Sequence, residues 1–218
     1  ASIVRYTTSM TTLSDTSILQ AENWLSSHDA VLAKIISTQP SCTVRPHQNY
    51  YQELVEAIIG QQLSVKAAAS ITARFVEHFG DFPSPEQLLE ADQEALRALG
   101  LSYAKIRYIK DLADHVLENK IRFEQFAKLT NEEILAQLLP VKGIGEWTVH
   151  MFLLFCMARS DVLATGDLGV RKAIQMHYGL DKLPTIEGIQ AVAKNGHWAP
   201  YESVACWHLW KSLDATTS

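Results

Sequence analysis

Residues 139–148 read Leu-Pro-Val-Lys-Gly-Ile-Gly-Glu-Trp-Thr, a glycine-rich turn between two apolar segments. The segment before it, 131–138, has the spacing of an amphipathic helix, and the segment after it, 147–157, is almost wholly apolar. Gly143 and Gly145 would let backbone N–H groups approach a ligand closely, and the start of a helix favours an anion. The turn therefore indicates a phosphate grip, although Gly-x-Gly between helices is often just a tight helix–helix turn.

Most of the remaining chain has the pattern of helices. Apolar residues recur at helical spacing over 17–36, 50–59, 102–119, 186–194 and 201–213. Gly80 and Gly100 are expected to end two more helices, and residues 83–86 predict a turn followed by a helix start. No segment alternates with a period of two residues, so the predicted fold class is all-α.

Two helix-breaking stretches, 39–46 and 158–169, divide the chain. They predict a central helical domain over 48–164 and a second lobe built from both chain ends, 18–47 plus 165–218. A cleft between the two lobes would be the natural place for an active site. Residues 1–17 are rich in Ser and Thr and are expected to form a mobile tail rather than a signal peptide.

The composition of the 218 residues is that of an ordinary soluble globular protein, with 47% hydrophobic and 20% charged residues. The formal net charge is −5, which argues mildly against a nucleic-acid partner but excludes neither a basic face nor contacts from backbone amides. The apolar segment after the glycines is too short to span a membrane. The three cysteines have no zinc or iron–sulfur spacing and indicate buried or free thiols in a reducing, intracellular compartment.

A second informative stretch, 161–172, reads Asp-Val-Leu-Ala-Thr-Gly-Asp-Leu-Gly-Val-Arg-Lys. Asp167 follows a glycine and precedes an apolar segment, which is the position of an N-cap. A capping aspartate is a common structural feature, and on spacing alone this interpretation is the simpler one. It does not exclude a catalytic role, because the same carboxylate can also face a site.

The glycine-rich turn, followed about twenty residues later by Gly-Asp-Leu-Gly-Val-Arg-Lys, resembles the helix–hairpin–helix (HhH-GPD) DNA glycosylase superfamily. Within it, the sequence is most similar to 3-methyladenine DNA glycosylase II. Two further blocks carry the resemblance, 59–68 (Ile-Gly-Gln-Gln-Leu-Ser-Val-Lys-Ala-Ala) and 198–210, which begins Trp-Ala-Pro-Tyr-Glu. The four blocks occur in the family's order and cover almost the whole chain beyond the tail.

The resemblance implies that Asp167 is the catalytic residue in cleaving the N-glycosidic bond of a damaged base flipped out of double-stranded DNA. Cleavage builds positive charge on the sugar, which a fixed carboxylate can stabilise. Members that also nick the strand carry a lysine where this chain has Trp147, and a tryptophan cannot form their Schiff base. Iron–sulfur members carry four cysteines near the C-terminal end, where this chain has only Cys206. We therefore expect a monofunctional enzyme that leaves an abasic site and needs neither a cofactor nor an iron–sulfur cluster.

Further site residues follow from the same resemblance. The base pocket is expected to contain Trp147 and Trp198, with Met151 where some relatives have a tyrosine; an aromatic pocket suits a cationic methylated purine such as 3-methyladenine or 7-methylguanine. The wedge that replaces the flipped base is expected at Gln62, with Leu63 behind it. Phosphate contacts are expected from Gly143, Gly145, Glu146, Trp147 and Thr148. A monovalent Na⁺ or K⁺ would be held by the backbone carbonyls of Leu139, Val141 and Ile144.

Two other interpretations remain open at this stage. The chain could be a non-catalytic helix–hairpin–helix DNA-binding module, in which Asp167 is only a cap, or a bifunctional glycosylase and lyase. For any of the three we expect a monomer whose partner is double-stranded DNA, with no membrane association. Trp207, Trp210 and the eight histidines are interpreted as packing or core residues without a catalytic role.

Overall fold

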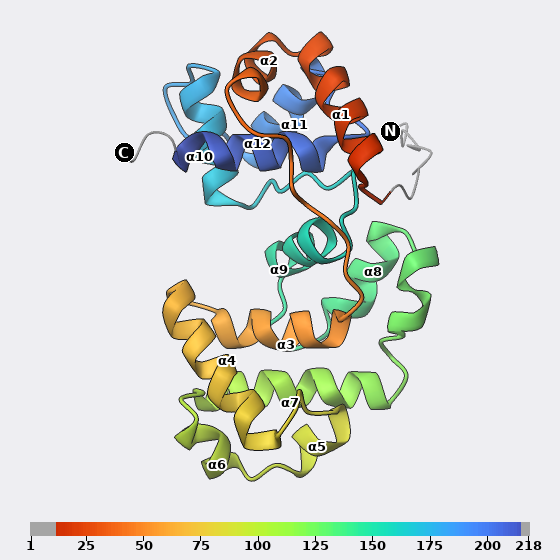
Figure 1. Ribbon diagram of the computed structural model, residues 1–218, viewed down its shortest axis with the longest axis vertical. Coiled ribbons are helices and arrows are strands. Elements are labelled where there is room, and N and C mark those ends of the chain that lie inside the picture. Colours follow the sequence, from red (N-terminus) through yellow and green to blue (C-terminus); the bar gives the residue numbers. More distant parts are fainter. Residues whose placement is uncertain (1–11, 215–218) are drawn as a thin grey trace. The chain divides into compact units, whose positions relative to one another are not determined.

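The computed structural model of this chain describes residues 12–214 (Figure 1). Within that range every regular element is helical, and a single antiparallel bridge joins Thr12 to Arg159. The predicted all-α class is therefore confirmed. None of the helices in this range has the length and apolar character needed to cross a membrane.

The chain divides into two compact units. Unit 1 contains the residues up to His47 and those from Leu153 onward, and unit 2 contains Gln48–Phe152. The sequence predicted that the central domain ends at residue 164, whereas in the structure it ends at Phe152 and residues 153–164 belong to unit 1. Backbone and side-chain bonds explain this, because Val162 N–H donates to Ser203 Oγ (3.0 Å) and Ser203 N–H donates to Ser160 O (3.0 Å).

Unit 1 is built around its last helix. Its five helices are α1 (Asp15–His28), α2 (Ala30–Ser37), α10 (Leu168–His177), α11 (Ile186–Asn195) and α12 (Glu202–Asp214). Helix α12 packs against α1, α2 and α10, and all of its residues from Ser203 to Leu209 are buried. A helix that is buried on every side is the core of its unit rather than an amphipathic surface helix.

The buried His208 on α12 is a hydrogen-bonded core residue. Its Nε2 lies 3.1 Å from Glu22 Oε1 on α1, and its Nδ1 lies 2.8 Å from Gln39 Oε1. The same Glu22 carboxylate accepts hydrogen bonds from the Ser41 hydroxyl and the Cys42 N–H. The interpretation of His208 as a satisfied core histidine is confirmed.

The helix expected over 17–36 is interrupted at Asp29. Its Oδ1 accepts from the N–H groups of Val31 (2.9 Å) and Leu32 (3.1 Å) and so caps α2. Its Oδ2 accepts from the Tyr178 hydroxyl (2.6 Å) and the Trp198 indole N–H (2.8 Å). The break is therefore tied to two residues distant in sequence, which the local apolar spacing does not reveal.

The N-terminal tail expected over 1–17 is shorter than predicted. Residues 1–11 lie outside the described part of the chain. Leu13 is buried and its N–H donates to Ala158 O (2.8 Å), and Ser14 caps α1, which begins at Asp15. Residues 12–17 thus belong to unit 1.

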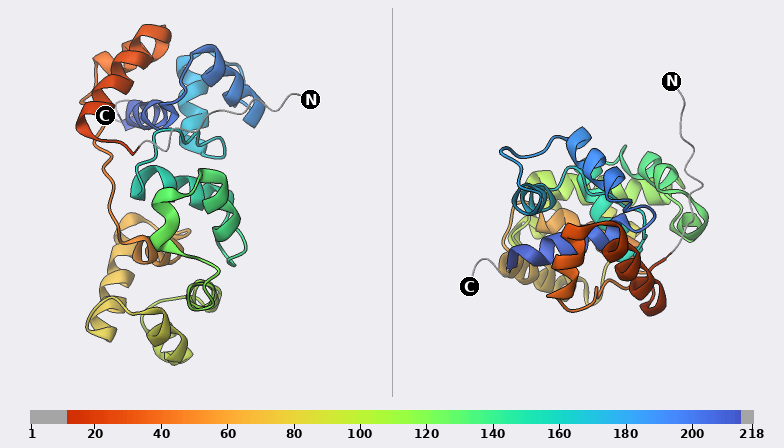
Figure 2. Two further views of the ribbon diagram at one scale, coloured as in Figure 1. Left: turned by 90° about the vertical axis from the view of Figure 1, so that its right-hand side faces the viewer. Right: turned by 90° about the horizontal axis from the view of Figure 1, so that it is seen from above.

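Unit 2 comprises seven α-helices and one short 3-10 helix. They are α3 (Tyr50–Gly60), α4 (Val65–Phe79), α5 (Pro85–Glu90), α6 (Gln93–Ala98), α7 (Tyr103–Leu117), the 3-10 helix Phe123–Lys128, α8 (Asn131–Leu138) and α9 (Glu146–Met151). Helix α7 runs alongside α3 and α5 and also contacts α6 (Figures 1 and 2). The expected C-cap Gly80 adopts the left-handed conformation (φ 80°), and Ser64, Ser84, Ser102 and Thr130 cap the starts of four helices.

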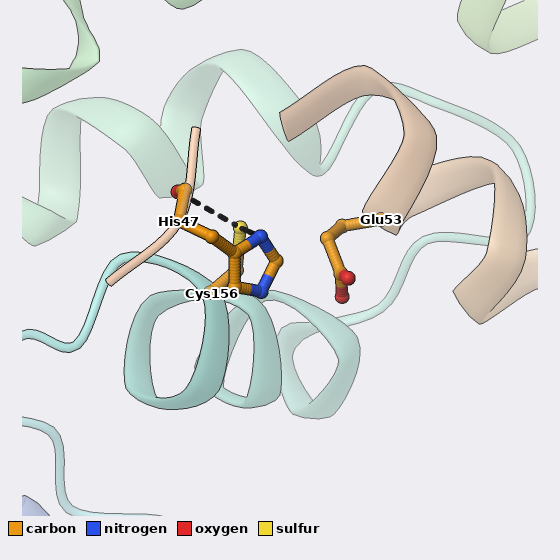
Figure 3. A group of neighbouring side chains, drawn as sticks. All are labelled: His47, Glu53 and Cys156. Carbon is orange, nitrogen blue, oxygen red and sulfur yellow. Dashed lines mark hydrogen bonds between the residues drawn. The ribbon is translucent and has the colours of Figure 1, made fainter. Parts of the chain in front are cut away.

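The apolar segment 147–157 is not one regular helix. It begins as α9 and continues as a π-helical turn over Phe152–Cys156. At the end of this turn the Cys156 carbonyl accepts from His47 N–H (3.0 Å), and the Cys156 sulfur lies 3.7 Å from His47 Nδ1 (Figure 3). These contacts join the two segments of unit 1 that lie next to its boundaries with unit 2, one ending at His47 and the other beginning at Leu153. Cys42, Cys156 and Cys206 are all buried, and none of them forms a disulfide bond.

Glu202, the first residue of α12, generates a prediction about pH and stability. Its Oε2 is buried without a hydrogen-bond partner, and burial, aided by nearby Asp161, raises the pKa of Glu202 to about 7. Because the unfolded chain ionises this group at lower pH, its contribution makes the folded state less stable as pH rises from about 4.5 through 7. We expect Glu202→Gln to raise the melting temperature clearly at pH 8 and much less at pH 5.

Thermal denaturation of the two proteins at both pH values measures this difference. The exposed Glu77→Gln on α4 is the matched control and should give the same small change at each pH. An equal shift for Glu202→Gln at pH 5 and pH 8 would contradict the assignment.

Candidate functional site

Residues of helix α7 bind and pack against the glycine-rich turn of unit 2. Lys142 N–H donates to Asp111 Oδ2 (2.8 Å), and its ammonium group lies 2.7 Å from Asp111 Oδ1. Burial raises the pKa of Asp111, but the hydrogen bonds and charge of Lys142 outweigh it and leave that pKa below its usual value. Gly143 has φ +83°, and a Cβ at this position would overlap the ring of Tyr108. Gly143 therefore permits both the left-handed backbone and the close approach of α7.

The residues after the turn form the start of α9. Gly145 precedes the helix, and Glu146 and Trp147 lie exposed in its first turn, where N–H groups have no partner within the helix. Trp147 is 49% exposed, and Met151 follows it one turn later on the same helix face. Thr148, the remaining residue expected to contact phosphate, is only 7% exposed.

The carbonyls expected to bind a cation belong to this same turn. Val141 O accepts from Ile144 N–H (3.1 Å), which closes the turn. Val141 and Ile144 are buried, whereas Leu139 is 45% exposed. A carbonyl has two lone pairs, so the bond within the turn leaves Val141 O able to act as an oxygen ligand. The donor set, neutral oxygens on a tight turn, suits a hard monovalent cation.

The predicted wedge residues lie on the turn between α3 and α4. Gln62 is exposed and has φ +59°, a left-handed conformation that is uncommon for a residue with a side chain. Leu63 is 38% exposed, and its N–H donates to Gly60 O (3.1 Å). The structure thus presents Gln62 and Leu63 together at the surface of unit 2, with Ser64 capping α4 behind them.

In unit 1, Asp167 caps α10 as its spacing indicated. Its Oδ1 accepts from Val170 N–H (2.9 Å) and also from the indole N–H of Trp210 (2.7 Å). Both bonds orient the carboxylate of Asp167. The residue remains partly exposed, so this oriented carboxylate also faces solvent.

The sequence did not reveal that Trp210 and Phe155 lie together near the end of α12, with Trp210 bound to Asp167. Trp210 was interpreted as packing, but it is only half-buried and contacts both Asp167 and Gly169, where a Cβ would lie 2.8 Å from Trp210 Cδ1. The ring of Phe155, which is 42% exposed, lies 5.4 Å from that of Trp210. No spacing within the sequence signals this arrangement, because Trp210 is 43 residues from the aspartate.

Trp198 occupies a different environment from the one expected. It is fully buried in unit 1, and its indole N–H is bound to Asp29. An indole without exposed surface presents no face to a ligand, so the structure assigns Trp198 to the core rather than to a pocket wall. Trp207, only 6% exposed, is a packing residue as predicted.

Comparison with known proteins shows the family to which the chain is similar. The model of a family described as "HhH-GPD superfamily base excision DNA repair protein" matches residues 55–196. DNA-3-methyladenine glycosylase 1 of Schizosaccharomyces pombe is 35% identical over 203 residues, which cover 90% of this chain and 88% of that protein. DNA-3-methyladenine glycosylase 2 of Escherichia coli is 26% identical over 192 residues, covering 84% of this chain and 64% of that protein.

The chain is also similar in structure to solved 3-methyladenine DNA glycosylases. The S. pombe 3-methyladenine DNA glycosylase in complex with abasic DNA superposes with a TM-score of 0.77 at 34% identity, covering 89% of this chain and 97% of that one. A DNA-3-methyladenine glycosidase from Bacillus halodurans superposes with a TM-score of 0.82 at 33% identity, covering 90% of each chain.

The two bonds to Asp167 predict how its substitution affects stability. Asparagine caps a helix about as well as aspartate, whereas alanine cannot accept the Val170 N–H. We expect Asp167→Ala to lower the free energy of unfolding by about 1 kcal/mol, and Asp167→Asn to lower it by roughly half of that or less. Urea denaturation of both variants checks this, and equal losses would show that the capping bond is not the stabilising contact.

Proposed function

The chain belongs to the HhH-GPD superfamily of base excision DNA repair proteins, and from this premise we propose that it is a monofunctional DNA glycosylase for alkylated bases. It binds double-stranded DNA as a monomer, flips out a methylated purine of the 3-methyladenine or 7-methylguanine type, and leaves an abasic site. The observation that carries the proposal is the Asp167 carboxylate, held by Val170 and Trp210 and still partly exposed.

Asp167 supplies the fixed negative charge that the reaction requires. As the N-glycosidic bond breaks, its electron pair leaves with the base, and positive charge develops on the sugar. A carboxylate already oriented by two N–H donors stabilises that charge without reorganising. Water then adds its oxygen to C1′ and releases its proton to solvent. A methylated purine that carries positive charge becomes neutral as it leaves, so little acid catalysis is needed.

Aromatic and polarizable side chains account for selection of a cationic base. In unit 1 Trp210 donates to Asp167 and the ring of Phe155 lies beside that of Trp210, whereas in unit 2 the exposed Trp147 and the half-buried Met151 lie one turn apart on α9. Electron-rich rings attract a cation over their faces, and a methionine sulfur adapts to irregular shapes. These four residues, and not the buried Trp198, are the ones we assign to base recognition.

Unit 2 supplies the contacts to the DNA backbone and stack. The hairpin residues Gly143, Gly145, Glu146 and Trp147 offer backbone N–H groups to phosphates, as helix starts do generally. Backbone donors do not need a basic surface, which fits the acidic composition of the chain. A Na⁺ or K⁺ bound by carbonyls of the hairpin would further offset phosphate charge. Gln62 and Leu63 form the wedge that replaces the flipped base.

The hairpin also limits the chemistry. A lyase step needs an amine that attacks C1′ to form a Schiff base, and position 147 carries an indole. Lys142 lies on the same hairpin, but its ammonium group is engaged with Asp111. The reaction accordingly ends at the abasic site.

A non-catalytic DNA-binding module is the second candidate, and one observation favours it. Asp167 does cap α10, which alone would explain its presence. A relative of S. pombe named "Alkylbase DNA glycosidase-like protein", 30% identical over 203 residues, covers 90% of this chain and 94% of that protein. Substitution of Asp167 separates the two candidates.

We expect Asp167→Asn to lower the single-turnover rate of base release from methylated DNA by about 10²–10³-fold. The amide keeps the helix cap but not the charge, so binding to duplex with an abasic-site analogue should change little. Chromatography of released 3-methyladenine and 7-methylguanine measures the rate. Full activity in the variant, or no base release by the unchanged protein, would refute the catalytic assignment.

Trp210→Phe should lower the same rate by about tenfold, the equivalent of one hydrogen bond to a charged group. The ring remains, but the N–H to Asp167 is lost. Trp24→Phe is the matched control, because it removes an indole bond to His197 O elsewhere in unit 1. A similar loss in both variants would mean that the effect is not specific to Asp167.

Borohydride reduction during turnover should trap no covalent protein–DNA adduct, because no amine occupies position 147. Gel electrophoresis of labelled DNA under denaturing conditions detects such an adduct. A trapped species whose cross-link maps to Lys142 would establish the bifunctional alternative instead.

A further inference from the structure

The wedge turn and the hairpin, which are far apart in the sequence, are joined by one hydrogen bond within unit 2. The side chain of Gln61 donates from Nε2 to the Gly143 carbonyl at 2.7 Å, across 82 residues. Gln61 is half-buried, whereas its neighbours Gln62 and Leu63 are exposed. The two consecutive glutamines therefore point to different surroundings, one to the hairpin and one to solvent.

Helix α7 independently contacts Gly143 and the end of α3, which directly precedes the turn that carries Gln61. Lys105 donates from Nζ to the Ile59 carbonyl (2.7 Å) at the end of α3, directly before the wedge turn. Burial lowers the pKa of Lys105, which is consistent with an ammonium group used for packing rather than left in solvent. Further along α7, Tyr108, three residues after Lys105, packs on Gly143, and Asp111, six residues after Lys105, binds Lys142. The Gln61 bond links the wedge turn to the hairpin, and α7 contacts the hairpin and the end of α3, so all three segments are connected.

This closed arrangement has a mechanical consequence for DNA binding. The hairpin is proposed to grip phosphates and Gln62 is proposed to enter the base stack, so the distance between the two sets how deeply the wedge reaches. The wedge turn is short, and Gln62 holds a left-handed backbone there (φ +59°). Misplacement of such a group by about 1 Å can cost about 10²-fold in rate. A hydrogen bond between the turn and the hairpin restricts movement of Gln62 relative to the hairpin before DNA binds.

We propose that Gln61 is a positioning residue that holds the wedge residue Gln62 in register with the phosphate-binding hairpin, so that backbone binding and wedge insertion occur as one event. This inference rests on the proposed function, but its first test does not require base release. Gln61 touches neither the base nor the sugar and acts only through Gln62 and Gly143.

The first test measures wedge insertion by fluorescence. The probe is duplex DNA with 2-aminopurine next to an abasic-site analogue, bound by Asp167→Asn protein with or without Gln61→Met. Methionine keeps the length of the side chain but cannot donate to Gly143 O. We expect the fluorescence rise on binding to be largely lost in the Gln61→Met protein, while affinity for undamaged duplex and its salt dependence stay within about twofold.

Gln52→Ala on α3 is the control, since the side chain of that glutamine donates to Glu56 on its own helix (2.8 Å), and this change should leave the signal unchanged. Because this assay reports binding alone, it remains informative if the protein releases no base, and failure of the proposed function is distinguished from failure of this inference. An unchanged fluorescence rise in Gln61→Met, or an equal loss of undamaged-duplex binding, would overturn the positioning role.

The second test is a double-mutant cycle in the otherwise unchanged enzyme. Gln61→Met and Gln62→Ala should each lower the single-turnover rate of base release by about tenfold or more. If Gln61 acts by placing Gln62, the double variant should be no slower than the slower single variant. Rates that multiply would show that Gln61 acts independently of the wedge. Gln61→Glu, which places a carboxylate against the carbonyl, repeats the test if Gln61→Met does not fold, and the same outcomes decide.

Discussion

Every helix leaves N–H groups at its start and carbonyl groups at its end without partners inside the helix, and a chain built from helices must satisfy them at each joint. In this protein three such helix ends carry residues to which we assign functional roles. Asp167 caps α10, the hairpin precedes the start of α9, and the turn between α3 and α4 carries Gln62. The requirement to complete helix ends thus places acceptors and donors where the proposed reaction would use a fixed charge and phosphate contacts.

Each joint is made rigid by a contact from a helix distant in sequence. The Trp210 indole on α12 fixes the carboxylate of Asp167, and the preceding residues of α12, from Ser203 to Leu209, are all buried. In unit 2, α7 fixes the hairpin through Asp111 and Tyr108. Contacts from distant helices therefore fix the position of each of these groups, while the local sequence at the helix end determines which group is present.

The helices were predictable where periodicity and capping agree. The segments 50–59, 64–79 and 131–138 carry apolar spacing together with a cap or a terminating glycine, and the structure has a helix at each. The prediction failed at 17–36 because Asp29 interrupts the helix and accepts hydrogen bonds from the half-buried Tyr178 and the buried Trp198. It also failed at 147–157, where the backbone widens into a π-helical turn although the side chains are uniformly apolar.

The sequence by itself determined the all-α class, the glycine-rich hairpin, the capping aspartate and the absence of an amine at position 147, because these depend on residue type and local spacing. Only the tertiary structure decided that Trp198 lies in the core, that Thr148 is buried, that Trp210 binds Asp167 and that Gln61 binds Gly143. Each of these depends on which face of a helix meets a partner far away in the chain. Local spacing shows that a tryptophan or glutamine belongs to a helix or a turn, but the packing of distant helices decides what its side chain contacts.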